Sequence, residues 1–484
     1  MALPTLRLIA FILGIFLITL AFSMIIPIIT LLSMGTPEGL SDFLWPTLIT
    51  FGCGLAMVLP GYPKNVQLRP RDMYMLTTSS WVVVCMFAAL PMVFIQHISY
   101  TDAFFETMSG ITTTGSTVLS GLDNASPALL IWRSMTQWLG GLGFIGMAVA
   151  VLPLLRIGGM RLFQTESSDW SEKVMPRSHM VAKSIVAVYL GLSLLCILAY
   201  WWAGMSLFEA INHAMTTIST GGYSTSDNSL GNWSQPAVHW VAVVFMLLGG
   251  LPFTLYVAFL RGHRQALLRD QQVRGFVGFL VLTWLIFGTW LWLHSDNAWL
   301  DAVRIVAVNV TSVVTTSGYA LGDYSQWGGF AVLLFFYLTF VGGCSGSTAG
   351  GLKIFRFQVA YVMLKANLQQ MIHPRAVIKQ QYNNHPIDED IVRSLVTFSF
   401  FFTITIGVIA LGLALIGLDW ITALTGAATA VCNVGPGLGP IIGPAGNFAS
   451  LPDSAKWLLS VGMLLGRLEI ITILVVLTPA FWRH

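Results

Sequence analysis

Short apolar segments, each closed by a glycine-containing turn, recur four times in this chain and constrain its fold more than any other feature. The first runs from Asp102 to Ser116, DAFFETMSGITTTGS, between two long apolar stretches. Its apolar part is too short to cross a bilayer, which takes about 20 residues as a helix. The other three end in STGGY at 219–223, TTSGY at 315–319 and CNVGPG at 432–437. They predict four re-entrant half-helices around one axis.

The rest of the chain has the composition of a membrane protein. Hydrophobic residues make up 55% and charged residues 9% of the 484 residues, which predicts an all-α polytopic membrane protein. The five cysteines are scattered without disulfide or metal-ligand spacing, and the basic residues do not cluster with aromatic residues, which excludes a nucleic-acid surface. We expect about ten transmembrane helices, at about 8–32, 44–60, 73–95, 128–155, 180–203, 237–260, 276–293, 329–368, 394–418 and 455–479.

The half-helices divide the chain into four helix, pore half-helix, helix repeats. Gly115, Gly222, Gly318 and Gly435 are 107, 96 and 117 residues apart, which suits a repeated membrane hairpin. All four half-helices enter from the same side, so we expect pseudo-fourfold symmetry about the membrane normal. The expected units are a leading pair of transmembrane helices at 1–62 and repeats at 63–160, 161–270, 271–385 and 386–484.

The charges of the loops predict an orientation. With the N-terminus in the cytoplasm, 20 of the 24 Lys and Arg residues fall inside, as the positive-inside rule requires. Twelve of the 21 acidic residues fall outside, where they would attract cations to an external mouth. The alternative is that acidic residues are merely tolerated on the outer side, because only Lys and Arg are sorted by the rule.

The four turns have the composition of a cation filter. At membrane depth, irregular backbone must be buried or line water, and its carbonyl groups can replace the hydration shell of a cation. Glycine permits such geometry, and the absence of charge favours a potassium-like ion over a divalent one. For any single turn, an ordinary glycine-closed helix end is the alternative. The candidate filter residues are Thr113, Thr114, Gly115, Thr220, Gly221, Gly222, Thr316, Ser317, Gly318, Asn433, Val434 and Gly435.

The register of the second turn is open. Gly222-Tyr223 matches Gly318-Tyr319, whereas Gly221 keeps the nine-residue distance from Asn212 that Gly115 has from Glu106. Both glycines therefore stay candidates.

The second helices of the repeats carry paired glycines at 140–141, 249–250 and 342–343, which indicate close helix packing. The fourth repeat has Gly466-Arg467, with Glu469 two residues later. Intramembrane charges usually face a bundle interior or an aqueous path. Arg467 is therefore expected to border the pore below the filter and limit ion occupancy; a structural Arg paired elsewhere is the alternative.

The third repeat interrupts its second helix with the sequence GGCSGSTAGG. Five glycines and three Ser or Thr residues in ten cannot hold a regular helix cheaply, and no GxxxxGK[ST] motif or preceding strand supports nucleotide binding. Below the filter, this loop is the best candidate for a gate. Its residues are Gly342, Gly343, Cys344, Ser345, Gly346, Ser347, Thr348, Ala349, Gly350 and Gly351.

Two cytoplasmic stretches, 157–183 and 365–393, contain charges of both signs. They could dock a soluble partner or be solvated loops.

Taken together, the four turns, the GGCSGSTAGG loop and LLGRLE around Arg467 resemble the Trk, Ktr and HKT superfamily of potassium uptake proteins, and within it the TrkH family. The resemblance covers essentially the whole chain, including the leading pair of helices. It implies a bacterial inner-membrane homodimer with one pore per protomer, cytoplasmic termini and a gate at 342–351. The conducted ions would be potassium, often rubidium and to some degree sodium. It also implies control by a cytosolic TrkA-like subunit, which alone would bind nucleotide, and no covalent cofactor.

Other function classes have weaker support. A secondary transporter that couples potassium to protons or sodium would need a titratable residue at midplane, and Glu469 is the only acidic residue so placed. The four filter-like turns argue against a non-conducting scaffold. The sequence has no HExxH motif and no set of Ser, His and acidic residues in a soluble domain, so it gives no indication of an enzyme.

Overall fold

Helices form most of the chain. The computed structural model describes residues 3–35, 39–62, 69–150 and 178–482. Most of the polar stretch 157–183, and the expected boundary at residue 160, lie outside the described residues.

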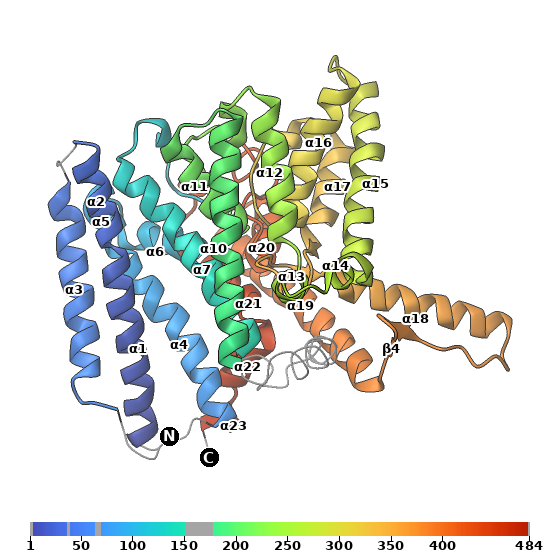
Figure 1. Ribbon diagram of the computed structural model, residues 1–484, viewed down its shortest axis with the longest axis horizontal. Coiled ribbons are helices and arrows are strands. Elements are labelled where there is room, and N and C mark those ends of the chain that lie inside the picture. Colours follow the sequence, from blue (N-terminus) through green and yellow to red (C-terminus); the bar gives the residue numbers. More distant parts are fainter. Residues whose placement is uncertain (1–2, 36–38, 63–68, 151–177, 483–484) are drawn as a thin grey trace.

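The leading helices lie at one edge of the molecule (Figure 1). They are α1 (Leu3–Ser23), α2 (Ile25–Ser33) and α3 (Leu40–Val58). Gly14 of α1 and Gly54 of α3 face each other's carbonyl oxygens, since small residues let membrane helices approach closely.

Four similar units follow. The first contains α4 (Pro70–Ala88), α5 (Leu90–Gln96), the pore helix α6 (Tyr100–Ile111), a 3-10 turn η1 (Leu122–Asn124) and α7 (Pro127–Ala150). The second contains α10 (Ser178–Ala203), the pore helix α11 (Leu207–Ile218), η2 (Ser229–Asn232), α12 (Pro236–Gly249), α13 (Phe253–Leu260) and α14 (Arg264–Arg269). The third contains α15 (Gln271–Leu293), the pore helix α16 (Trp299–Val314), η3 (Tyr324–Gln326), α17 (Gly329–Phe340) and α18 (Ile354–Ile372). The fourth contains α19 (Glu389–Ile416), the pore helix α20 (Trp420–Cys432), α21 (Asp453–Arg467), α22 (Ile470–Leu477) and α23 (Pro479–Trp482).

The pore helices are too short to span a membrane. They have 12, 12, 16 and 13 residues, or about 18 to 24 Å at 1.5 Å per residue. Three begin at a side-chain cap: Ser99, Ser206 and Asp419 each accept a hydrogen bond from the amide three residues on, as N-cap residues do.

The predicted all-α fold with four pore repeats is confirmed, with two of the expected spans bent. Among the described residues, six helices are long and apolar enough to cross a bilayer, and two bent pairs raise the number to eight. The helices α12 and α13 meet at 91° and α21 and α22 at 112°. Pro252 lies within the first break, and Glu469 lies at the second with a φ of +55°.

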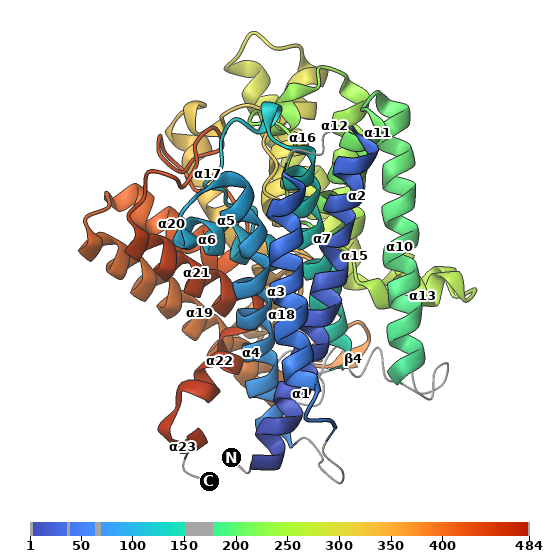
Figure 2. The ribbon, with the colours of Figure 1, turned by 90° about the vertical axis from the view of Figure 1, so that its left-hand side faces the viewer.

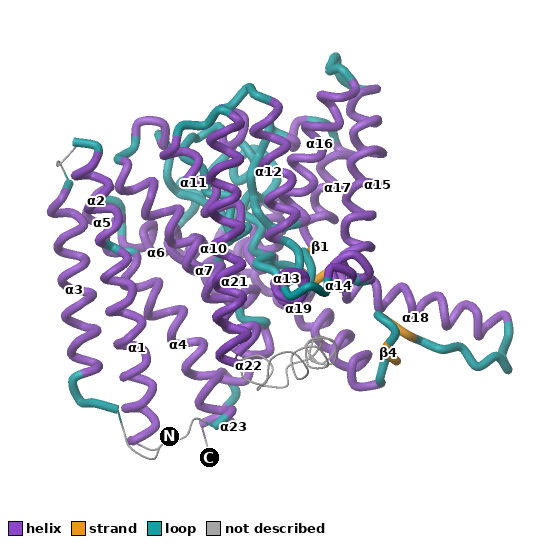
Figure 3. Tube along the Cα trace, in the orientation of Figure 1, coloured by secondary structure: helices purple, strands orange, loops and turns teal. Residues whose placement is uncertain are grey.

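Strands occur at two places in the described chain, where they shape connections (Figure 3). β1 (Val341–Gly342) pairs in parallel with β2 (Leu352–Lys353) and closes the base of the glycine-rich loop. β3 (Gln381–Tyr382) and β4 (His385–Pro386) form a hairpin beside α18. Its turn residues Asn383 and Asn384 both have positive φ, as a tight hairpin turn requires.

The ends of the described chain lie on the same side of the molecule. Figures 1 and 2 show the start of α1 and the end of α23 at one end of the helical body, and Figure 1 shows α18 projecting away from it. An even number of membrane crossings gives this arrangement.

Candidate functional site

All four pore helices end in the same backbone conformation. A residue other than glycine has a φ of 53° to 56° at Thr113, Thr220, Thr316 and Asn433, and a glycine with positive φ follows two residues later. In each repeat the amide between these two residues donates back to the carbonyl five residues earlier, for example Thr114 to Ser109 at 2.8 Å. This is a helix cap of the Schellman type. Because positive φ is uncommon outside glycine, its occurrence at the same position of all four turns indicates that the repeats share one specific backbone structure.

This conformation fixes the register of the second turn. Gly222 has a φ of +76° and follows Thr220 by two residues, whereas Gly221 does not have positive φ. Gly222 is therefore the structural equivalent of Gly115, Gly318 and Gly435, and Gly221 corresponds to Thr114.

The four positive-φ glycines form a closed ring. On each, a methyl group would crowd the carbonyl oxygen of the residue just before the glycine of a neighbouring repeat. The pairs are Gly115 with Gly221, Gly222 with Ser317, Gly318 with Val434, and Gly435 with Thr114. They run once through all four repeats and return to the first, so the turns surround a common axis.

A polar side chain in each pore helix holds the extended chain that follows the ring glycine. Glu106 accepts from the amide of Val118 at 2.8 Å, Asn309 from that of Leu321 at 2.9 Å, and Thr425 from that of Leu438 at 3.1 Å. In the second repeat His213 shares a hydrogen bond of 3.0 Å with the Ser224 hydroxyl. The residue equivalent to Glu106 is thus His213 rather than Asn212, which agrees with the register of Gly222.

Two tyrosines join neighbouring repeats. The hydroxyl of Tyr223 donates to the Glu106 carbonyl at 2.7 Å, and that of Tyr319 donates to the His213 carbonyl at 3.2 Å. Each tyrosine follows its ring glycine and reaches the equivalent residue of the preceding repeat. Ser116, in the same position of the first repeat, donates to the Gly435 carbonyl at 2.7 Å.

A buried ion pair lies behind the first turn. Arg133 of α7 donates from Nε to Glu106 at 2.9 Å, and both side chains are at most 2% exposed. Its other nitrogens donate to Ser224 and Thr117, and its guanidinium lies 4.1 Å from the centre of the Tyr223 ring. The charges of the two buried side chains are thereby paired with each other, as burial requires.

The four ring glycines line one cavity. This cavity of about 260 Å³ is lined by Gly115, Gly222, Gly318 and Gly435, together with loops that include Asp227. Residues after the ring glycines line it and the pore helices do not, so the cavity lies on one side of the ring.

The glycine-rich loop lies directly against the turns. The Thr348 hydroxyl donates to the Ile218 carbonyl at 3.1 Å, and the Gly350 amide donates to the Thr316 hydroxyl at 2.7 Å. A side chain at Gly350 would meet the Cys432 carbonyl and Asn433. The loop thus contacts three of the four repeats.

The paired glycines pack as the sequence predicts, with one exception. Gly140, Gly249 and Gly466 each face a carbonyl near the end of their own repeat's pore helix, at Ile111, Ile218 and Val431. Gly342 instead faces the carbonyl of Gly350, because the loop occupies this space in the third repeat.

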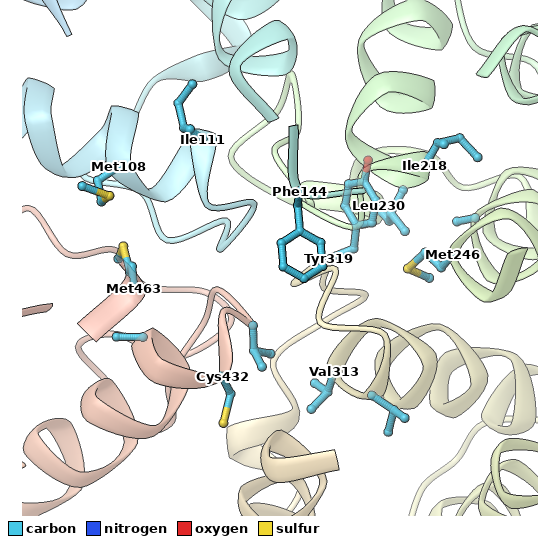
Figure 4. Packing of buried hydrophobic residues seen from close by; sticks show 14 of the residues in the cluster. Met108, Ile111, Phe144, Ile218, Leu230, Met246, Val313, Tyr319, Cys432 and Met463 are labelled. Carbon is cyan, nitrogen blue, oxygen red and sulfur yellow. The ribbon is translucent and has the colours of Figure 1, made fainter. Parts of the chain in front are cut away.

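Arg467 reaches the loop from α21. Its Nη1 donates to the Thr348 carbonyl at 2.8 Å, and its guanidinium lies 4.0 Å from the centre of the Phe144 ring. Its Nε and Nη2 have no hydrogen-bond partner in the described part of the chain. Phe144 of α7 is drawn near the middle of the four repeats in Figure 4.

Two further cations lie close by. Lys353 donates to the Ala349 carbonyl and lies 5.5 Å from the Phe144 ring centre. Arg356 forms an ion pair with Glu469 at 3.6 Å, so Glu469 pairs with a residue of the third repeat rather than with Arg467.

The structure thus brings together all the residues predicted for the filter, the gate and the pore charge. Sequence reasoning missed Arg133, Gln137, Phe144, Lys353 and Gln272, each of which contacts a turn, the loop or Arg467. Arg133 and Lys353 lie within the expected spans 128–155 and 329–368, where no local pattern reveals their partners, and Phe144 is one apolar residue among many.

Comparisons with known proteins agree on one family. The family model TrkH, described as a cation transport protein, matches residues 51–483. Relatives include the Trk system potassium uptake protein TrkI of Halomonas elongata, 52% identical over 96% of this chain and 95% of its own, and TrkH of Escherichia coli, 34% identical over 99% of both. The crystal structure of the potassium transporter TrkH from Vibrio parahaemolyticus matches with a TM-score of 0.90 at 34% identity, covering 99% of this chain and 100% of its own.

The buried ion pair gives a stability prediction. Arg133→Met leaves the Glu106 carboxylate buried without a counter-charge, which we expect to cost about 3–5 kcal/mol of unfolding free energy. Arg304→Met is the control, because its partner Asp301 is half exposed and such pairs contribute about 1 kcal/mol or less. Thermal unfolding in detergent measures both. Adding Glu106→Gln to Arg133→Met should restore part of the loss, and equal destabilisation by Arg133→Met and Arg304→Met would contradict the prediction.

Proposed function

Since the chain belongs to the TrkH family of cation transport proteins, we propose that potassium ions cross the membrane along the axis of its four turns. It is a multi-pass membrane protein for potassium uptake, not an enzyme. The observation that carries the proposal is the closed ring of Gly115, Gly222, Gly318 and Gly435, which all line one cavity.

The chemistry of the ring suits a weakly hydrated monovalent cation. The four pore helices direct their carboxyl ends, the negative pole of the helix dipole, towards it. The turns contribute backbone and hydroxyl oxygens without a charged side chain, and carbonyl ligands of this kind favour potassium. Rubidium should follow potassium, with some passage of sodium because the four turns differ in sequence.

We propose that residues 342–351 are the gate and that the structure corresponds to its closed position. The loop is bound on one side to the turns through Thr348 and Gly350 and on the other to α12, where the Cys344 amide donates to the Gly250 carbonyl at 2.9 Å. In this position Arg467 and Lys353 add positive charge beneath the ring, which repels cations.

The coupled transporter has less support. A carrier for protons would need a free titratable group on the ion path. Glu469 faces Arg356 at 3.6 Å, and Glu106 is paired with Arg133.

A cytosolic TrkA-like subunit and a second copy of the chain are proposed as partners, in a bacterial inner membrane with both termini cytoplasmic. A path from the cytoplasmic side to the gate supports regulation. The hairpin residue Asn383 and Gln271 exchange hydrogen bonds of 2.7 and 3.0 Å. The neighbouring Gln272 accepts from the amide of the gate residue Ser345 at 2.8 Å.

Rubidium uptake into liposomes that contain the purified protein tests the pore. We expect uptake above that of empty liposomes, strong competition by potassium, weaker competition by sodium and none by choline. Uptake should persist when the pH gradient is collapsed. Uptake that required a proton gradient would favour the transporter, and no uptake with or without a cytosolic subunit would refute the proposal.

Shortening the loop tests the gate. Deletion of Ser345 to Gly350 removes the contacts to Ile218 and Thr316, so rubidium flux should rise severalfold.

Arg467→Ala should also raise rubidium flux, by about fivefold, the factor that corresponds to 1 kcal/mol of lost repulsion. Unchanged flux and ion affinity in both variants, with normal folding, would exclude these roles.

The hairpin contact gives a separate prediction. Asn383→Ala removes the side-chain bonds to Gln271 and Asp270, which should loosen the 270–272 segment and raise basal flux without a partner. Gln381→Ala, on an exposed residue of the same hairpin, is the control. The same basal flux in both variants would argue against this path.

A further inference from the structure

The second filter turn is the only one of the four with glycine at the position before the ring glycine. Thr114, Ser317 and Val434 occupy this position elsewhere. Gly221 is not required by its backbone, because its φ is not positive. A different constraint must act on this residue.

That constraint is the side chain of Gln137. A Cβ atom on Gly221 would overlap the carboxamide of Gln137, which projects from α7 of the first repeat and is fully buried. The absence of a side chain at Gly221 therefore makes room for a group from the neighbouring repeat.

Both polar atoms of the Gln137 carboxamide bind backbone of the second turn. Nε2 donates to the Gly221 carbonyl at 2.7 Å, and Oε1 accepts from the Tyr223 amide at 3.0 Å. With the two atoms exchanged, an NH₂ group would face an amide N–H, so the contacts define one orientation. The carboxamide thus spans Gly222 and holds the residues on both sides of it.

The second helices of the other three repeats have no comparable group at the equivalent position. Counting back three residues from Gly249, Gly342 and Gly466, as Gln137 lies before Gly140, gives Met246, Thr339 and Met463. The methionines cannot form such a pair of hydrogen bonds, and the Thr339 hydroxyl donates to Phe335 in its own helix.

The held carbonyl is also part of the ring. Gly115 packs against the Gly221 oxygen, so its position sets the spacing between the first and second turns. Two consecutive glycines would otherwise leave the Gly221-Gly222 peptide freer to rotate than any other in the ring.

We propose that Gln137 is a positioning residue that determines ion selectivity by fixing the second filter turn. The proposal rests on the proposed function of the ring as a potassium filter. Gln137 and Gly221 form one unit, in which the glycine accommodates the carboxamide and the carboxamide immobilises the glycine pair. A looser turn would adapt to the smaller sodium ion and discriminate less against it.

Gln137→Met tests the hydrogen bonds, because methionine has a similar volume and is the residue found at two equivalent positions. Rubidium uptake into liposomes, with potassium and sodium as competitors, should show a preference for potassium over sodium that is reduced about three- to tenfold, as expected for one or two lost neutral hydrogen bonds. Gln369→Met, exposed on α18, is the control and should keep the preference. An unchanged preference in folded Gln137→Met would overturn the selectivity role.

The steric part is tested by a double-variant cycle that needs no transport. Gly221→Ser should lower the unfolding temperature in detergent by about 2 °C or more, because serine overpacks the site. In the Gln137→Ala background the same change should have a much smaller effect, since the space is then free. An equal loss in both backgrounds would overturn the unit of Gln137 and Gly221.

The two measurements separate this inference from the proposed function. If the unchanged protein takes up no rubidium, the proposed function fails and the selectivity role fails with it, while the cycle still decides whether Gln137 braces the turn. If the unchanged protein transports and Gln137→Met keeps its preference, the inference alone fails.

Discussion

Four irregular backbone turns lie buried inside a helical membrane protein, and the structure depends on the need to bind their polar groups there. Water cannot satisfy these groups in the hydrocarbon region, so each turn is capped by its own pore helix and packed against the next turn. Because every ring glycine faces a carbonyl of a neighbouring repeat, a change in one turn shifts the space available to the next. The ring is therefore one structural unit, although its parts are about 100 residues apart in the sequence.

Similar backbone does not mean similar bracing. A charged pair, Glu106 and Arg133, lies behind the first turn, whereas His213 and Gln137 hold the second. The side chain of Asn309 holds the third turn, because it donates to the Leu321 carbonyl and accepts from the Leu321 amide. The fourth uses Asn433, which donates to Thr114 and to the Met463 carbonyl. The repeats thus share a backbone design, while each acquires its own side chains for the same mechanical task.

The sequence predicted the general arrangement because its main signals are local. Apolar length and the glycine turns predicted the helices and three of the four ring glycines, whereas the orientation inferred from loop charge stays a prediction. The choice between Gly221 and Gly222 could not be made from spacing, since it depends on which residue has positive φ. Glu469 at the bend after α21 carries no local signal for a helix break, unlike Pro252 at the bend after α12. Arg133 carries no local signal of burial, because its partner Glu106 lies 27 residues earlier.

A hydrogen bond joins Arg467 to the glycine-rich loop, which is the proposed gate. Within the described residues, Arg467 has one hydrogen bond, to the Thr348 carbonyl of the loop, and its guanidinium lies over the ring of Phe144. In the proposed gating scheme, movement of the loop withdraws this carbonyl, and a buried guanidinium without a partner is strongly disfavoured. Water must then reach Arg467, or its side chain must turn towards another acceptor. In this scheme, opening both removes the obstruction and hydrates the region beneath the ring. Arg467 therefore stabilises the closed loop while water is excluded from its guanidinium, and it stabilises the open loop once water reaches it.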